Sequence, residues 1–291
     1  MIGYPVLYGI IWILTLLPFK VLYIISDFLS FITYYLIPYR KKVTLTNLKK
    51  SFPEKSSTEI KKIAKKFYRH LFDLFLESFK LLQLDEQEIL KHYSYQNPEV
   101  LDDLYLKNKS IIAVFGHYGN WEWLASLPLV TKYNVLAVYK PLLNKSIDKL
   151  CIRLREKFGV VTITMQQTLR KIIEYQQNHK LTITFFLGDQ RPLRRDIRYW
   201  TTFLNQDTPV LLGVERISKK TNQAVIYIDI QKKKRGHYEI VFTKLFENPN
   251  ETGDYEITEA HTRILWKNII NRPELWLWSH RRWKHEKLIE K

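Results

Sequence analysis

The sequence contains very little cysteine: Cys151 is the only one in 291 residues. A single thiol cannot close an internal disulfide or supply the cysteine cluster of a structural zinc site. The chain therefore fits a reducing compartment. Followed by IleArgLeuArg, Cys151 is more typical of a small buried apolar residue than of a nucleophile. No HisGluxxHis pattern or Cys/His cluster occurs either, so we expect no metal and no cofactor.

Acidic residues are also scarce. The chain has 29 Asp and Glu against 46 Lys and Arg, which gives a formal net charge of +17. Such an excess indicates a polyanionic partner, either nucleic acid, an anionic membrane or acidic ligands. No recognised nucleic-acid-binding motif is present and the N-terminus is apolar, so we expect no nucleic acid partner.

The N-terminal region lacks a single uninterrupted apolar run. Residues 4–17 are apolar, Pro18 and Lys20 interrupt the run, and residues 21–38 are mostly apolar but include Asp27. A spanning helix needs about 20 apolar residues. Two arrangements remain open: one tilted span kinked near Pro18, or two helices that form a shallow hairpin in one leaflet.

Two other interpretations of this region are a cleaved signal peptide and a buried helix pair. A cleaved signal peptide is disfavoured because the first 19 residues contain no Lys or Arg and no small-x-small site follows. The alternative of a buried helix pair in a soluble core stays open. Residues 40–66 hold ten Lys or Arg and two Glu, and basic residues beside a membrane segment favour the cytoplasmic side. We therefore predict a membrane anchor over residues 1–39 and a cytoplasm-facing domain over residues 40–291.

Within the second region, short apolar runs alternate with helical patterns. We predict strands over residues 111–115, 135–139, 160–163, 181–187, 225–231 and 238–246. Helices are expected over residues 57–82 (capped by Ser57), 98–106, 121–128, 145–157, 166–178 and 256–271. This alternation predicts an α/β fold with a mostly parallel sheet flanked by helices.

The sharpest motif is GlyHisTyrGlyAsnTrpGlu, which directly follows the first predicted strand. His117 and Glu122 would lie about 140° apart on a regular helix, so they can meet only if His117 sits on a turn before the helix that carries Glu122. An imidazole, whose ordinary pKa is about 6.5, can take the proton of a hydroxyl group. A carboxylate on its other nitrogen fixes the tautomer. The motif thus indicates a His/Glu dyad that acts as a general base. A chance spacing and half of a metal site were the alternatives.

Three further segments offer candidate binding residues. Asp189 and Gln190 follow the predicted strand 181–187, where Asp189 could orient a base, hold a substrate or simply form a turn. Arg153 and Arg155 could bind phosphate or carboxylate, or form a solvated helix face. The segment 273–284 combines three tryptophans with several basic residues. Its tryptophans could fill the core or line an interface, and its bases could bind phosphate.

Together these segments resemble the late lipid A biosynthesis (Kdo-dependent) acyltransferase family, within the bacterial lysophospholipid and glycolipid acyltransferase superfamily. The similarity rests on five ordered segments: 40–54, GlyHisTyrGlyAsnTrpGlu, ValTyrLysPro followed by ArgLeuArg, GlyAspGln, and ProGluLeuTrpLeuTrpSerHisArgArgTrpLys. It covers about residues 1–285. No single motif would be as specific as this order.

The resemblance implies an acyltransferase at the cell inner membrane. Its donor would be an acyl carrier protein thioester and its acceptor a phosphorylated glycolipid, a lipid A precursor. His117 would be the base and Glu122 its partner, while Arg153 and Asp189 match further functional positions and Arg155 and Gln190 lie beside them. Two alternatives remain: an acyltransferase for another bacterial lipid, such as an aminolipid or glycophospholipid, and a non-catalytic membrane-surface binding protein.

Overall fold

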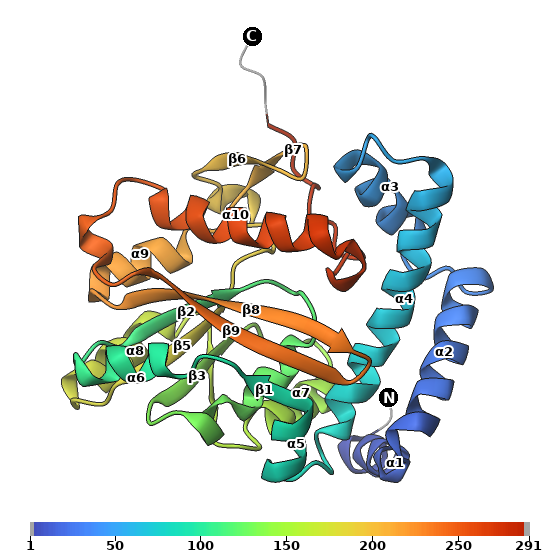
Figure 1. The fold of residues 1–291 in the computed structure, drawn as a ribbon, viewed down its shortest axis with the longest axis horizontal. Coiled ribbons are helices and arrows are strands. Elements are labelled where there is room, and N and C mark those ends of the chain that lie inside the picture. The colour runs from blue at the N-terminus through green and yellow to red at the C-terminus, as the bar shows by residue number, and fades with distance from the viewer. Residues whose placement is uncertain (1–2, 288–291) are drawn as a thin grey trace.

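A seven-stranded sheet forms the centre of the molecule, and a computed structural model describes residues 3–287 of the chain (Figure 1). Its strand order is β1-β9-β8-β2-β5-β3-β4. All neighbouring strands are parallel except β8 and β9, which form an antiparallel hairpin. The strands are β1 (Tyr93–Tyr95), β2 (Ile111–Phe115), β3 (Asn134–Tyr139), β4 (Val161–Thr164), β5 (Thr182–Leu187), β8 (Ala224–Lys234) and β9 (His237–Phe246). A small separate hairpin pairs β6 (Trp200–Phe203) with β7 (Gln206–Pro209).

Helices cover both faces of the sheet. The α-helices are α1 (Tyr4–Leu16), α2 (Phe19–Tyr35), α3 (Lys41–Ser51), α4 (Ser57–Lys80), α5 (Glu86–His92), α6 (Glu99–Leu106), α7 (Lys145–Arg155), α8 (Thr168–Gln177), α9 (Gly213–Thr221) and α10 (Glu256–Asn271). Short 3₁₀ helices are η1 (Trp121–Val130), η2 (Arg194–Asp196), η3 (Pro249–Glu251) and η4 (Pro273–Leu275). The predicted α/β fold with a mostly parallel, helix-flanked sheet is confirmed.

Strand β2 shows why the core has two layers. All five of its residues are buried, and successive side chains point to opposite faces. Ile111, Ala113 and Phe115 join a cluster with η1, α6 and α7, whereas Ile112 and Val114 join one with α4 and α10. A strand covered on both faces needs apolar side chains at every position, which explains its unbroken apolar sequence.

Two of the predicted helices differ from expectation in their details. Helix α4 is capped by Ser56, not Ser57, because Ser56 accepts a hydrogen bond from the backbone of Glu59 and Glu59 bonds back to Ser56. Such a capping box needs the glutamate three residues after the cap. The segment after the His/Glu motif is a 3₁₀ helix that contains Pro128. Proline lacks the N–H that an α-helix interior requires. Strands β1, β6 and β7 and helices α3, α5 and α9 were not predicted.

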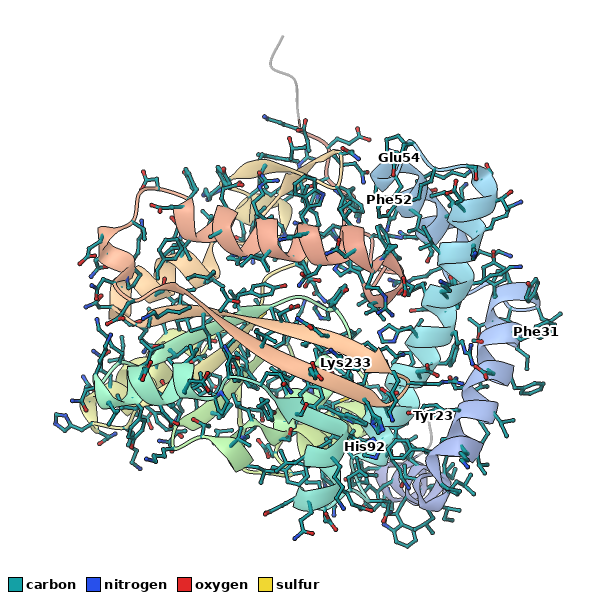
Figure 2. All side chains as sticks on the ribbon, viewed as in Figure 1. Tyr23, Phe31, Phe52, Glu54, His92 and Lys233 are labelled. Atoms are coloured by element: carbon teal, nitrogen blue, oxygen red, sulfur yellow. The ribbon has the colours of Figure 1, made fainter. Side chains whose placement is uncertain are left out.

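Helices α1 and α2 form a sharply bent pair around Pro18. No single described helix has the length and composition to cross a membrane, but this pair together does, with a bend of 118°. The outer face of α2 exposes large apolar side chains at Ile24, Phe28 and Phe31, and Figure 2 shows Phe31 pointing away from the body of the molecule. Its inner face packs along α4 (Figure 1).

Candidate active site

The loop after β2 carries the histidine of the motif. A side chain at Gly116 would come within 2.7 Å of Leu265, and one at Gly119 would come within 2.7 Å of Ile230. Gly119 also has a φ of +64°, a conformation that favours glycine. These two glycines let the loop turn tightly under α10 and against β8, with His117 between them.

Strand register places His117 beside Asp189. Phe115 and Leu187 are paired at the ends of the parallel strands β2 and β5, and each site residue lies two positions further along its chain. Because parallel strands end at the same edge of the sheet, the two loops emerge side by side. The structure therefore brings together two residues that are 72 positions apart in sequence.

Asp189 holds His117 through two hydrogen bonds. Its carboxylate accepts from the Nδ1 of His117 at 2.7 Å and from the His117 backbone N–H at 2.8 Å. The indole of Trp276 donates a third hydrogen bond at 2.8 Å. Burial alone would raise the pKa of Asp189, but the adjacent His117 and these hydrogen bonds outweigh it and lower the pKa to about 2. Asp189 is thus a carboxylate at any physiological pH.

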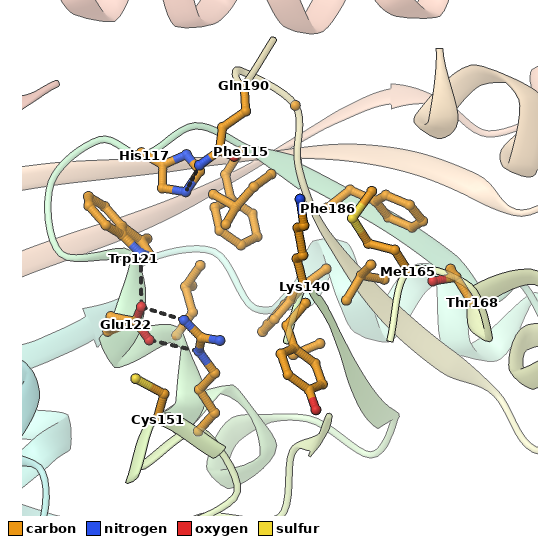
Figure 3. Close-up of a pocket in the computed structure, with 18 of the residues that line it drawn as sticks. Phe115, His117, Trp121, Glu122, Lys140, Cys151, Met165, Thr168, Phe186 and Gln190 are labelled. Atoms are coloured by element: carbon orange, nitrogen blue, oxygen red, sulfur yellow. Dashed lines mark hydrogen bonds and ion pairs between the residues drawn. The ribbon is translucent and has the colours of Figure 1, made fainter. Parts of the chain in front are cut away.

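These contacts fix which nitrogen of His117 is available. Since Nδ1 is bonded to a carboxylate, it carries the proton, and Nε2 keeps the lone pair that a base needs. The side-chain amide of Gln190 lies 3.1 Å from Nε2 and serves as its donor. Figure 3 shows Gln190 beside His117 in the lining of the cavity.

Glu122 makes a different set of contacts. It accepts two hydrogen bonds from the guanidinium of Arg155, at 2.9 and 2.7 Å, and one from the indole of Trp121 at 3.1 Å. Burial would raise its pKa, but the charge and hydrogen bonds of Arg155 lower it overall. Within residues 3–287, Glu122 has no hydrogen bond to His117. The ring of Trp121 packs against His117 at a centroid distance of 5.0 Å and links the two residues.

The two arginines of α7 point to different places. Arg155 lines the cavity beside His117, where Glu122 holds it. Arg153 instead lies over the ring of Tyr8 in α1, 4.6 Å from its centroid. The alternation along α7 thus separates an arginine at the site from one that packs against the N-terminal helix pair.

A cavity of about 670 Å³ opens beside His117 and runs between β3, β5, η1, α7 and α9. Its walls are mainly apolar (Figure 3). Besides His117, Glu122, Arg155 and Gln190, the lining includes Phe115, Leu124, Ala125, Ala137, Val138, Leu142, Cys151, Val160, Met165, Phe185, Phe186, Leu187, Val214 and Ile217. An apolar cavity that ends at a histidine suits a substrate with a long hydrocarbon chain and a reactive polar end.

The sequence did not reveal the roles of Trp121 and Trp276. From sequence, Trp276 is only a residue that could fill the core or line an interface, because its hydrogen bond to Asp189 joins positions 87 residues apart. For Trp121, the sequence offers one indication of a role at the site, which is its position next to Glu122. No described cluster of three or more His, Cys, Asp or Glu side chains could hold a metal ion.

Comparison with known proteins gives a consistent result. Residues 4–285 match the family described as bacterial lipid A biosynthesis acyltransferase. The chain is similar to a lipid A biosynthesis palmitoleoyltransferase of Escherichia coli (strain K12), with 21% identity over 277 residues, 95% of this chain and 89% of the relative. A lipid A biosynthesis acyltransferase of Shigella flexneri matches with the same identity and coverage.

Proposed function

The chain belongs to the bacterial lipid A biosynthesis acyltransferase family, and we propose that it moves a fatty acyl group from acyl carrier protein to a hydroxyl of a lipid A precursor. Membership makes the chain an acyltransferase, so the non-catalytic alternative is set aside. The observation that carries the proposal is the Asp189–His117 pair at the mouth of an apolar cavity.

In the proposed reaction, His117 is the general base. Gln190 swings away, and the acceptor hydroxyl donates to Nε2 of His117. As the hydroxyl oxygen attacks the thioester carbon, its proton passes to Nε2, and Asp189 stabilises the imidazolium. The tetrahedral intermediate then collapses, the carbon–sulfur bond breaks, and the proton moves from Nε2 to the departing thiolate. The products are an ester and a free thiol.

We assign Glu122 and Arg155 a joint role in this reaction. The fork of two hydrogen bonds fixes the guanidinium on the cavity wall. A fixed positive charge near the thioester would stabilise the oxyanion that forms on its carbonyl oxygen. Glu122 then supports the histidine indirectly, through Trp121 and through its negative charge. We therefore keep the His117–Glu122 dyad as a proposal in which Glu122 acts on His117 indirectly.

The substrates fit complementary surfaces. We place the acyl chain in the apolar cavity, and the acidic carrier protein on the basic outer surface, since opposite net charges speed encounter. We further propose that residues 1–39 anchor the enzyme at the cell inner membrane. The exposed apolar face of α2 would enter the lipid, with residues 40–291 as a cytoplasm-facing acyltransferase domain.

A transfer assay tests the proposal. Purified protein in detergent is mixed with acyl carrier thioesters and a tetra-acylated Kdo–lipid A precursor, and mass spectrometry follows the products. We expect one added acyl group. Asp189→Asn should slow transfer by about 10²–10⁴-fold while the fold is kept, because the histidine loses the partner of its Nδ1 proton.

Asp196→Asn is the matched control, since Asp196 is an exposed carboxylate in the same loop, and it should keep the wild-type rate. A wild-type rate for Asp189→Asn would refute the base assignment. Transfer onto an aminolipid or glycophospholipid, with none onto the lipid A precursor, would keep the chemistry and change the acceptor.

A further inference from the structure

The C-terminal segment 276–285 lies directly on the catalytic loop. The backbone N–H of Leu277 donates to the carbonyl of His117 at 3.1 Å, and Trp276 pairs with Tyr118 in an isolated bridge. This packing carries Arg282 and its neighbours next to the loop that follows β5. Arg191, His280, Arg282 and His285 do not line the apolar cavity, so they form a separate polar environment near the histidine.

Arg282 is a buried cation with unused hydrogen-bond donors. It is 2% exposed, and its Nη2 donates to the carbonyl of Pro209 at 2.8 Å. Its Nε and Nη1 have no hydrogen-bond partner among residues 3–287. An unpaired buried charge is costly to a protein, so an arginine kept in this state suggests that an anion from outside the chain completes its surroundings.

A second cation, Arg191, forms no ion pair with any carboxylate among residues 3–287. Arg191 donates to Nε2 of His285 at 3.1 Å; because arginine can only donate, that histidine nitrogen accepts and neutralises no charge. Asp189 already accepts three hydrogen bonds, from His117 and Trp276. Asp189 therefore has most of its hydrogen-bonding capacity committed to His117 and Trp276.

His280 adds another unused polar atom to the cluster. Its Nε2 is buried and has no hydrogen-bond partner among the described residues. Burial lowers the pKa of His280 to about 4, so it is neutral and can donate or accept without adding charge. Burial also lowers the pKa of Arg282 to about 10, Asp189 opposes this and Arg191 adds to it. Arg282 is therefore still charged at neutral pH.

We propose that Arg191, His280 and Arg282 form an anion site that binds a phosphate group of the acceptor lipid beside His117. Phosphate is one of the anions whose oxygens match the fork of planar guanidinium donors, and the acceptor proposed above carries it. The cluster lies outside the cavity assigned to the acyl chain, which favours the acceptor over the donor as the source of that phosphate. The site would hold the headgroup while its hydroxyl is presented to Nε2 of His117. This step rests on the proposed function.

The test compares two acceptors in two variants. With wild-type enzyme, enzymatic removal of phosphate from the acceptor should raise its KM by about ten- to hundredfold, the range for hydrogen bonds to charged groups. In Arg191→Gln the phosphorylated acceptor should lose most of that advantage, while the donor KM and the kcat at saturating acceptor stay close to wild type. Arg195→Gln removes the same charge from an exposed side chain in the same loop and should behave as wild type.

A second measurement does not depend on turnover. Inorganic phosphate should raise the Tm of wild-type protein with increasing concentration, because ligands of the native state stabilise it. Chloride at equal ionic strength should not. Arg191→Gln should weaken the phosphate effect, and Arg282→Lys, which keeps the buried charge but loses the planar donors, should weaken it as well.

The outcomes separate the two proposals. A phosphate effect without any acyl transfer would support the anion site and count against the proposed function. Transfer with no phosphate effect, equal KM changes in Arg191→Gln and Arg195→Gln, or a change confined to the donor KM would overturn the anion site and leave the proposed function standing.

Discussion

Glu122 and Arg155 form a half-buried ion pair whose side chains are 22% and 25% exposed. We predict that Glu122→Gln keeps the fold and loses nearly all transfer, because the guanidinium is no longer held in place. Removing one partner of a buried pair costs up to about 3–5 kcal/mol, and the partial exposure here reduces that figure. Chemical denaturation and transfer assays measure the two effects separately.

A double-variant cycle shows whether the two residues act as a unit. Arg155→Gln should lower the rate to a similar extent, and Glu122→Gln/Arg155→Gln should be more stable than the sum of the single changes predicts. Additive losses of both rate and stability would mean that the pair does not function together. Lys171→Gln, in an exposed ion pair with Glu174, serves as a control in which neither property should change much.

Glu77 is a buried carboxylic acid behind the catalytic loop. Tyr23, Asn120 and Tyr238 all donate hydrogen bonds to it, and Asn120 belongs to the His/Glu motif. Burial is the main cause that raises its pKa from 4.5 to about 7, with Lys232 opposing and Asp73 adding to the shift. It titrates near neutral pH, far from its usual range.

A pH dependence of stability follows from that raised pKa. Between pH 4.5 and about 7 the folded protein keeps a proton on Glu77 that the unfolded chain has released, so the free energy of unfolding should fall as pH rises through this window. Glu77→Gln, which can satisfy the same three partners, should remove this contribution. Urea midpoints of the two proteins across this range measure it, and parallel curves would contradict the assignment.

At the scale of elements, the α1–α2 pair is tied to the rest of the chain by ionic contacts. Arg235, at the β8–β9 turn, donates to Asp27 of α2 and to Asp73 of α4. Figure 2 places Tyr23 of α2 at the same turn, where Arg235 lies 4.3 Å from its ring centroid. The inner face of α2 is therefore tied to α4 and to the β8–β9 turn, and its outer face carries the exposed apolar side chains.

That arrangement predicts how membrane association depends on α2. Replacing Ile24, Phe28 and Phe31 with serine should weaken binding to vesicles that contain anionic lipid, since each buried apolar side chain contributes about 1.5–3 kcal/mol. Leu106→Ser removes an apolar side chain of α6 that is even more exposed, at 79%, and should have little effect. Vesicle flotation measures the binding of both variants. An equal loss of vesicle binding in the two would contradict the assignment of α2 as the membrane contact.

At the scale of the whole molecule, charge is divided between regions. Residues 1–39 contain one base and one acid, so the +17 excess belongs to the remaining 252 residues (291 minus 39). This arrangement places a neutral apolar segment beside a strongly basic one. Anionic headgroups and an acidic carrier protein would both be attracted to the basic part.

We therefore predict a strong salt dependence of donor use. The kcat/KM for acyl carrier thioesters should fall steeply as ionic strength rises, because screening shortens the reach of surface charge, while kcat at saturation stays nearly constant. A pantetheine thioester that lacks the carrier protein is the control and should respond weakly. The same slope for both donors would mean that carrier charge does not steer binding.

Local sequence patterns were sufficient for six of the seven strands of the main sheet and for part of the site. Buried strands such as 111–115 can be recognised by their unbroken apolar runs. The loops that follow such strands carry His117 and Asp189, so both positions could be found from the sequence. The detail that failed, Ser57 as the cap of α4, depended on contacts of single residues, and the helix expected over 121–128 is present as a 3₁₀ helix. Strands β6 and β7 are short and mixed in polarity, which leaves little periodicity to detect.

The pairing of charged groups was decided by the tertiary structure alone. Which carboxylate bonds to His117 depends on the register of β2 against β5, and which arginine of α7 enters the site depends on the face that α7 turns toward η1. The side chain of Arg282 is buried because the C-terminal segment folds onto the catalytic loop. Sequence fixes which side chains a chain carries and its local periods, whereas contacts between positions far apart follow from how the elements pack.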